Sequence, residues 1–172
     1  MNRIRIVIAF CAAITVLAAL ATVSSGQAEK KLYTKMTGKE EKPTKGDPDG
    51  KGTAVLTLKA TKVCYDIRPT KAGLTFTLGH IHLGKKGKAG GIFIPLFTKT
   101  KKVVGHTKPS TIKIGKLAGC SRKVSPADLA MVVAKPADYY LNIHTKQFRG
   151  GALRGQLTAK APPPKPPVKA KP

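Results

Sequence analysis

The sequence predicts an all-β protein: a Greek-key antiparallel β-sandwich or barrel with one short helix. Through the middle of the chain apolar residues mostly alternate with polar ones, and clusters of Gly, Pro, Asp and Lys interrupt this alternation. With 172 residues, of which 41% are hydrophobic, the chain has room for one domain and short appendages. We expect a signal peptide at 1–28, a β domain at 29–158 and a disordered tail at 159–172.

Residues 1–28 have the pattern of a secretory signal peptide. Arg3 and Arg5 form a basic start, an apolar stretch follows at 6–22, and small and polar residues lead to a cleavage point after Ala28. The apolar stretch, about 17 residues, is short for a bilayer span. We therefore expect removal of the signal, secretion and no transmembrane span after processing, with a retained membrane anchor as the alternative.

Positive charge dominates the composition. The chain has 32 Lys+Arg against 8 Asp+Glu, a net charge of +24, and loss of Arg3 and Arg5 with the signal would leave +22. Most of these charges are Lys, flexible point charges that attract polyanions with little discrimination. A specific nucleic-acid reader usually adds aromatic platforms, but aromatics are only 5% here. We expect an extracellular or cell-envelope partner, a wall or matrix polyanion or a protein, with solvation alone as the alternative.

Eight segments have the alternation or the composition of strands. They are 32–37, 52–59, 62–68, 74–83, 91–97, 111–114, 137–145 and 152–159. In 52–59, for example, Ala54, Leu56 and Leu58 share one face. Pro95 cannot donate to a ladder, so its strand should be an edge strand or carry a bulge.

Two segments depart from the strand pattern. Ser125 can cap a short helix, Pro126 suits its first position, and Asp128 lies in its first turn. The tail at 159–172 holds six Pro and four Lys, which favours an extended polyproline II arm.

Two cysteines, Cys64 and Cys120, remain after removal of the signal. In an oxidising compartment they most simply form one disulfide, worth roughly 4 kcal/mol in the chain-entropy model. Neither has a second thiol nearby, so the spacing does not suit a C-x-x-C redox motif or a cysteine zinc site.

Three histidines form the sharpest chemical feature. In Gly79-His80-Ile81-His82-Leu83-Gly84, His80 and His82 stand at i and i+2 and can present both imidazoles on one face of a strand. His144 lies on a later strand, and pairing of the two strands would bring three imidazoles together, a set that suits copper or zinc. The alternatives are a structural role, pinning loops by hydrogen bonds, and a pH-dependent binding surface.

The face of these histidines depends on local regularity. A regular strand would put His80 and His82 on the same side as Phe76 and Leu78, unless Gly79 introduces a bulge. Arg154, on the last predicted strand, is a candidate anion contact, with a structural bond to a carbonyl or to Asp66 as the alternative.

Other chemistries find no support. The sequence contains no G-x-S-x-G, H-E-x-x-H or G-x-x-x-x-G-K-[ST] motif. Asp47-Pro48-Asp49-Gly50 could begin a calcium loop, but Leu58 stands where the bidentate Glu would be required, so a turn is expected.

The chain resembles the CHRD (chordin) domain family over roughly 32–157. The carrying elements are Lys39-Glu40-Glu41-Lys42-Pro43, the H-I-H segment, Tyr140-Leu141-Asn142-Ile143-His144-Thr145 and Gly150-Gly151-Ala152-Leu153-Arg154-Gly155-Gln156-Leu157. The resemblance implies a stand-alone, extracellular all-β module. It does not carry over growth-factor binding, since no feature here encodes that partner.

The order His80, His82, His106, His144 and Arg154 is more faintly similar to the copper/zinc superoxide dismutase sandwich. Four histidines in total cannot build its two-metal site, and His106 lies in a Lys-rich segment where exposure is expected. The leading hypothesis from sequence is a non-catalytic secreted module with a basic surface and no cofactor. The alternative is a copper- or zinc-binding protein with superoxide dismutase-like oxidoreductase activity.

Overall fold

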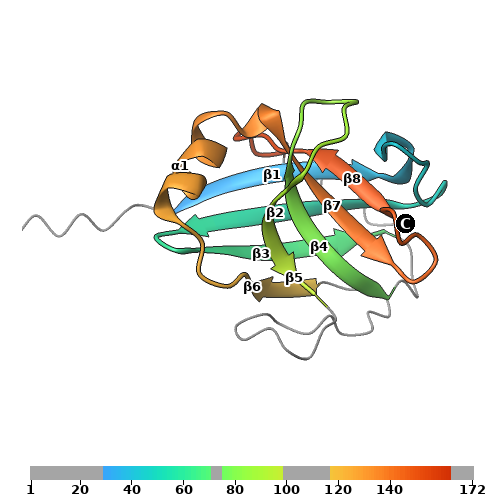
Figure 1. Cartoon of the computed structure of the whole chain (residues 1–172), viewed down its shortest axis with the longest axis horizontal. Helices are drawn as coiled ribbons and strands as arrows, with labels where there is room; N and C mark the ends of the chain where they lie inside the picture. Colours follow the sequence, from blue (N-terminus) through green and yellow to red (C-terminus); the bar gives the residue numbers. More distant parts are fainter. Residues whose placement is uncertain (1–28, 71–74, 99–116, 164–172) are drawn as a thin grey trace, which may run out of the picture.

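One antiparallel sheet dominates the computed structural model, which describes residues 29–70, 75–98 and 117–163. The strand order is β5-β4-β7-β8-β1-β2-β3-β6, and the sheet curls into a nearly closed barrel (Figure 1). The strands are β1 (Lys30–Thr37), β2 (Lys51–Lys59), β3 (Lys62–Pro69), β4 (Phe76–Leu83), β5 (Ile92–Phe97), β6 (Leu117–Cys120), β7 (Tyr139–Thr145) and β8 (Leu153–Gln156). The all-β prediction is confirmed.

Alternating burial explains the strands on one side of the barrel. In β2 the side chains of Ala54, Leu56 and Leu58 are buried, whereas Lys51 and Lys59 are exposed, as the period of two predicts. β5 is an end strand of the sheet order, which confirms the edge position expected from Pro95.

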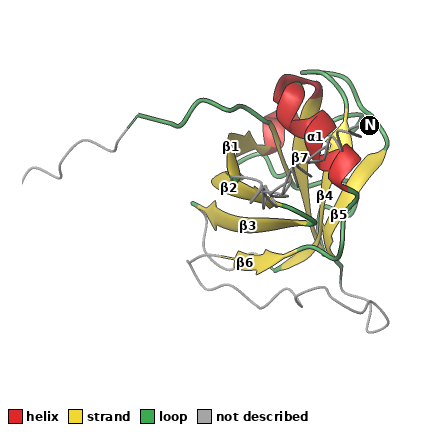
Figure 2. Ribbon diagram, turned by 90° about the vertical axis from the view of Figure 1, so that its left-hand side faces the viewer, coloured by secondary structure: helices red, strands yellow, loops and turns green. Residues whose placement is uncertain are grey.

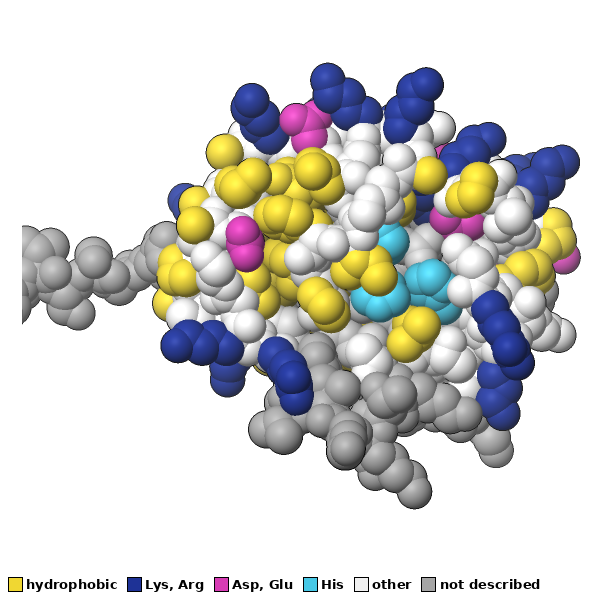
Figure 3. All heavy atoms as spheres, viewed as in Figure 1, with side chains coloured by type: hydrophobic (Ala, Val, Ile, Leu, Met, Phe, Trp, Pro, Cys, Tyr) yellow, Lys and Arg dark blue, Asp and Glu magenta, His cyan; other side chains and the backbone are white. Residues whose placement is uncertain are grey.

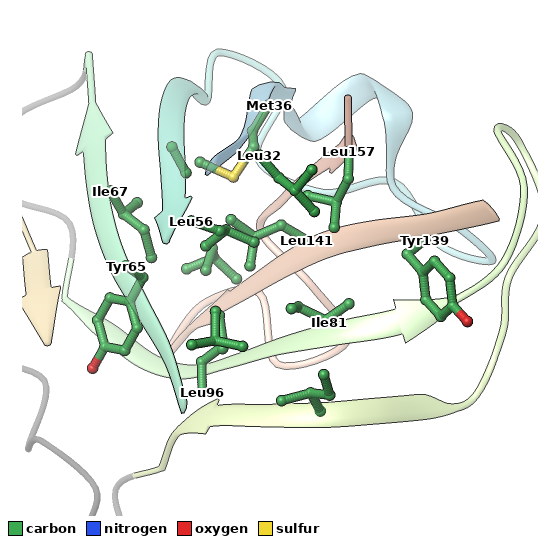
Figure 4. Close-up of a cluster of buried hydrophobic side chains, with 14 of the residues drawn as sticks. Leu32, Met36, Leu56, Tyr65, Ile67, Ile81, Leu96, Tyr139, Leu141 and Leu157 are labelled. Carbon is green, nitrogen blue, oxygen red and sulfur yellow. The ribbon is translucent and has the colours of Figure 1, made fainter. Parts of the chain in front are cut away.

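The core lies inside the barrel, between strands that are distant in the sequence (Figure 4). Leu32 of β1, Leu56 of β2 and Leu141 of β7 are all buried there. The rings of Tyr65 in β3 and Phe97 in β5 lie 5.2 Å apart, although six strand positions separate these strands in the sheet order. Such a contact is available only because the sheet closes on itself.

The helix α1 (Pro126–Ala134) lies at one end of the barrel (Figure 2). Ser125 caps it as predicted, since its hydroxyl accepts a hydrogen bond from the backbone N–H of Ala127 at 3.2 Å. Leu129 and Val132 point from the helix into the core. Two 3-10 turns, η1 (Gly38–Glu40) and η2 (Pro136–Asp138), complete the regular structure of the described residues.

The predicted disulfide joins Cys64 and Cys120, with an S–S distance of 2.08 Å. The two residues are opposite each other in the pairing of β3 with β6. β6 was not predicted, because four residues, Leu117-Ala118-Gly119-Cys120, are too few to show an alternation.

Several sequence predictions need adjustment. The strand expected at 74–83 begins at Phe76, and the one expected at 152–159 ends at Gln156. The strand expected at 111–114, the signal peptide at 1–28 and most of the tail lie outside the described residues.

We expect Leu141→Ala to lower the free energy of unfolding by about 2–5 kcal/mol, because it leaves a cavity among fully buried side chains. Urea unfolding followed by circular dichroism measures this. The matched control is Ile92→Ala, an apolar residue that is 56% exposed, which should change stability by less than about 0.5 kcal/mol. Equal losses for the two variants would contradict the proposed core.

Candidate metal centre

Three neighbouring strands, β4, β7 and β8, bring the candidate residues together. In their pairing His80 stands opposite Asn142, and Asn142 stands opposite Arg154. Two residues along the strands, His82 stands opposite Tyr140. These two rows share a face of the sheet, since successive residues alternate between the core and the outer face.

A bulge in β4 turns the histidines away from the core. Phe76 pairs with Thr145 and Leu78 with His144, so the register with β7 shifts between Phe76 and Leu78. Phe76 is consequently buried in the core, while Leu78 shares the outer face with the histidines. The histidines therefore lie on the other face from Phe76, but the shift that separates them precedes Gly79, the residue at which the sequence allowed for a bulge. A second shift, in the pairing with β5, falls between Gly79 and His80.

Pairing of β4 with β7 brings the three imidazoles together. One ring nitrogen from each of His80, His82 and His144 lies within 4.8 Å of the others. The ring centroids of His80 and His82 are 5.6 Å apart, and those of His80 and His144 are 5.2 Å apart. Figure 3 shows the histidine side chains as one contiguous patch on the face that carries β4 and β7. His80 is 6% exposed and the other two are half-buried.

Backbone carbonyls fix the tautomers of two rings. Nδ1 of His82 lies 2.9 Å from the carbonyl oxygen of Gly90, and Nδ1 of His144 lies 2.8 Å from that of Arg149. A carbonyl only accepts, so each Nδ1 donates a proton and each Nε2 retains its lone pair. Nε2 of His82, Nε2 of His144 and Nδ1 of His80 are buried and have no hydrogen-bond partner among the described residues. Metal-ligating histidines are typically held in this way.

Burial keeps the imidazoles neutral. Desolvation, with smaller effects of the neighbouring His144 and His82 rings, lowers the pKa of His80 from 6.5 to about 4. Burial also lowers the pKa of His82 and of His144, against the opposing effect of their carbonyl hydrogen bonds. The neutral form is the one that ligates metals, so the lone pairs stay available at neutral pH.

Tyr140 supports His82 from the neighbouring strand. The two rings stack with centroids 4.8 Å apart and an interplanar angle of 10°. The Tyr140 hydroxyl donates to the carbonyl of Gly90 at 3.3 Å and accepts from its N–H at 3.1 Å. Tyr140 and His82 therefore share the carbonyl of Gly90. These hydrogen bonds hold the segment 84–91, between β4 and β5, against the two rings.

Arg154 is buried behind this stack, with an exposed fraction of 1%. Its Cζ lies 3.5 Å from the centroid of the Tyr140 ring, and Nη2 donates to the carbonyls of Lys85 and Lys88 at 3.2 and 2.6 Å. The structural bond to a carbonyl is therefore observed, whereas Asp66 pairs with Arg68. The role of Arg154 as an anion contact stays a prediction.

The buried carboxyl group of Glu41 lies next to Asn142, the residue opposite His80. Asn142 donates from Nδ2 to Oε2 of Glu41, which is 2% exposed. Burial raises the pKa of Glu41, and the charge of Arg154 partly opposes this. A Cβ at Gly151 would overlap the Glu41 carboxyl, which explains the glycine there, at a φ of 136°.

Sequence reasoning missed the supporting groups. Nothing in a residue type marks the carbonyls of Gly90 and Arg149 as acceptors, because every residue carries one. A signal for Tyr140 was present, since it shares strand parity with His144 and Asn142. His106, the remaining histidine, lies outside the described residues.

The spacing of the three nitrogens fits a metal ion after a small closure. Bonds of about 2.0–2.1 Å from nitrogen to zinc place ligating atoms roughly 3.4 Å apart. The most distant pair, at up to 4.8 Å, would have to approach by up to about 1.4 Å on binding.

The fold and the site together define an all-β module with a cluster of three histidines on the outer face of its sheet. The family model of the CHRD domain matches residues 32–157, and the chain belongs to this family. CHRD domains occur in extracellular proteins, in agreement with the predicted secretion. No curated protein and no solved structure matches the chain. Within the ranges that the structure describes, no helix is long and apolar enough to cross a membrane.

The low pKa of His80 predicts acid sensitivity of the metal-free protein. Between about pH 6.5 and pH 4 the unfolded chain binds a proton at this position that the folded protein does not, so stability falls as pH falls. The raised pKa of Glu41 acts in the opposite direction. Urea unfolding across this pH range should show a smaller slope in His80→Gln than in the unsubstituted protein. An identical slope would contradict a buried neutral His80.

Proposed function

We propose that the protein is a secreted CHRD module that binds one transition-metal ion, copper or zinc, through His80, His82 and His144. Two observations carry this proposal: one ring nitrogen from each imidazole lies within 4.8 Å of the others, and each ring has a buried nitrogen without a hydrogen-bond partner in the described part of the chain. Neutral imidazole is a preferred ligand for both metals. The proposal is binding, not catalysis.

The structural alternative explains less of the geometry. Histidines that only pin loops would satisfy their polar atoms, because a buried polar atom without a partner is costly. Here Nδ1 of His82 and Nδ1 of His144 are satisfied by backbone carbonyls, while Nε2 of each ring is buried without a hydrogen-bond partner in the described residues. A metal ion would provide the missing partner for all three rings at once.

The purified mature protein should bind about one equivalent of copper or zinc, and His82→Ala or His144→Ala should weaken the affinity at least about tenfold, as loss of a ligand predicts. Calorimetry and elemental analysis measure affinity and stoichiometry.

The matched control is His106→Ala, which removes a histidine outside the proposed set. Metal binding should survive in this variant. Loss of binding in His106→Ala, or its persistence in His82→Ala and His144→Ala, would contradict the assignment.

A second function is supported by the charge. All lysines in the described residues are exposed, and the chain as a whole carries +24. Figure 3 shows Lys and Arg side chains around the edge of the histidine face. We propose that this surface, with the Lys- and Pro-rich tail, holds the module to cell-wall or matrix polyanions through long-range attraction.

Retention on a heparin column should fall as salt rises toward about 1 M, where the Debye length is about 3 Å. Replacing the exposed Lys39, Lys42 and Lys45 with Gln should bring elution to lower salt. The control replaces three exposed uncharged residues, Thr44, Thr53 and Thr70, with Ala. Retention that is absent, or insensitive to salt, would contradict this second function.

Superoxide dismutase-like turnover is the catalytic alternative for the same three histidines. It requires that the copper-loaded protein consumes superoxide faster than the metal-free protein does. It also requires that His82→Ala abolishes this increase in rate. Without that result the proposed function is metal binding alone.

A further inference from the structure

We propose, on the basis of the proposed metal site, that the site selects copper in the +1 state over divalent ions. The donor set is neutral, and the nearest buried cation, Arg154, places positive charge behind it. Such surroundings penalise an ion of charge +2 more than one of charge +1, since the repulsion scales with the ion's charge.

The donor set contains imidazoles alone. The group of residues able to hold a metal consists of His80, His82 and His144, with no carboxylate or thiolate among its members in the described ranges. Neutral ligands leave the full charge of the ion uncompensated, whereas an anionic ligand would favour a divalent ion.

The number of ligands favours the same ion. Structural zinc sites use four protein ligands, zinc sites with three histidines need a water as the fourth ligand, and copper in the +2 state prefers four or more ligands in a tetragonal arrangement. Copper in the +1 state is a closed-shell ion without that geometric demand, so three imidazoles are sufficient for it. The described residues provide three donors.

Arg154 contributes a charge that water screens poorly. Its side chain is 1% exposed, and its guanidinium lies 3.5 Å from the centroid of the Tyr140 ring. The same ring stacks on His82 with centroids 4.8 Å apart, so the guanidinium and a ligated ion would be separated by two stacked rings, a separation at which burial of Arg154 leaves a Coulomb interaction. The charge of Arg154 also contributes to lowering the pKa of His82.

Glu41 provides an opposite charge on the same side of the sheet. It is buried, and it accepts a hydrogen bond from Asn142, which stands opposite His80. Arg154 and Glu41 interact electrostatically. Removal of Arg154 and removal of Glu41 should therefore change the preference of the site in opposite directions.

The test compares affinities for the two oxidation states in the full mature protein. Copper in the +1 state is titrated anaerobically with ascorbate as reductant, in competition with a chromophoric chelator. Copper in the +2 state and zinc are titrated in parallel without reductant. We expect the tightest binding for copper in the +1 state, and the ratio of the two copper affinities is the quantity to follow.

The variants isolate the electrostatic effect. Arg154→Gln should reduce the preference for the +1 state about tenfold, and Glu41→Gln should increase it by a similar factor. Arg154→Lys keeps the charge while losing the paired hydrogen bonds to Lys85 and Lys88, so it should keep the preference. Damage to the fold would weaken the binding of every ion in every variant. It would not move the ratio of the two copper affinities in opposite directions.

Tighter binding of zinc or of copper in the +2 state would overturn the inference, and so would a ratio that shifts the same way in Arg154→Gln and Glu41→Gln. Either result leaves the proposed metal site intact. The proposed function itself fails only if no ion binds, which makes the two failures distinguishable.

Discussion

The antiparallel register of β4 against β7 is the constraint on which the site depends. It sets His80 beside Asn142 and His82 beside Tyr140, while Leu78 faces His144. A slip by one residue would turn the whole set to the other face. The bulge between Phe76 and Leu78 belongs to this constraint, because it lets one strand bury Phe76 and still present two histidines outward.

The barrel covers its polar outer face with a loop. Arg154, Tyr140 and His82 all bond to carbonyls of the segment 84–91, and Gln156 adds a bond to the carbonyl of Gly84 at 2.8 Å. These bonds use acceptors that the loop backbone would otherwise offer to water, and they bury a positive charge and two rings. The loop thus covers part of the sheet face beside His82, and burial lowers the pKa of each of the three imidazoles.

Positive charge enters the proposals in two different ways. The exposed lysines make a field that reaches polyanions over about one Debye length. The buried Arg154 acts only at short range, within the stack on Tyr140. Surface charge therefore governs attachment and responds to salt, whereas buried charge governs the proposed preference among metal ions and responds little to salt.

Local sequence patterns were sufficient to predict several structural features of this protein. The alternation in β2, the Ser125 cap, the pair Cys64 and Cys120 and the parity of His80 with His82 were all read from residues close in sequence, or from compartment and count. Residue parity and capping depend on the backbone within a few residues, so a single sequence contains them.

Tertiary structure alone decided which atoms of the site are free. The distance among the three imidazoles, the carbonyl partners of His82 and His144, the burial of Arg154 and the short strand β6 depend on segments far apart in the chain. Strand register and loop position are set by packing of the closed barrel, and backbone acceptors are chemically alike at every residue. No residue letter therefore distinguishes Gly90 or Arg149 as the acceptor that leaves an imidazole nitrogen open.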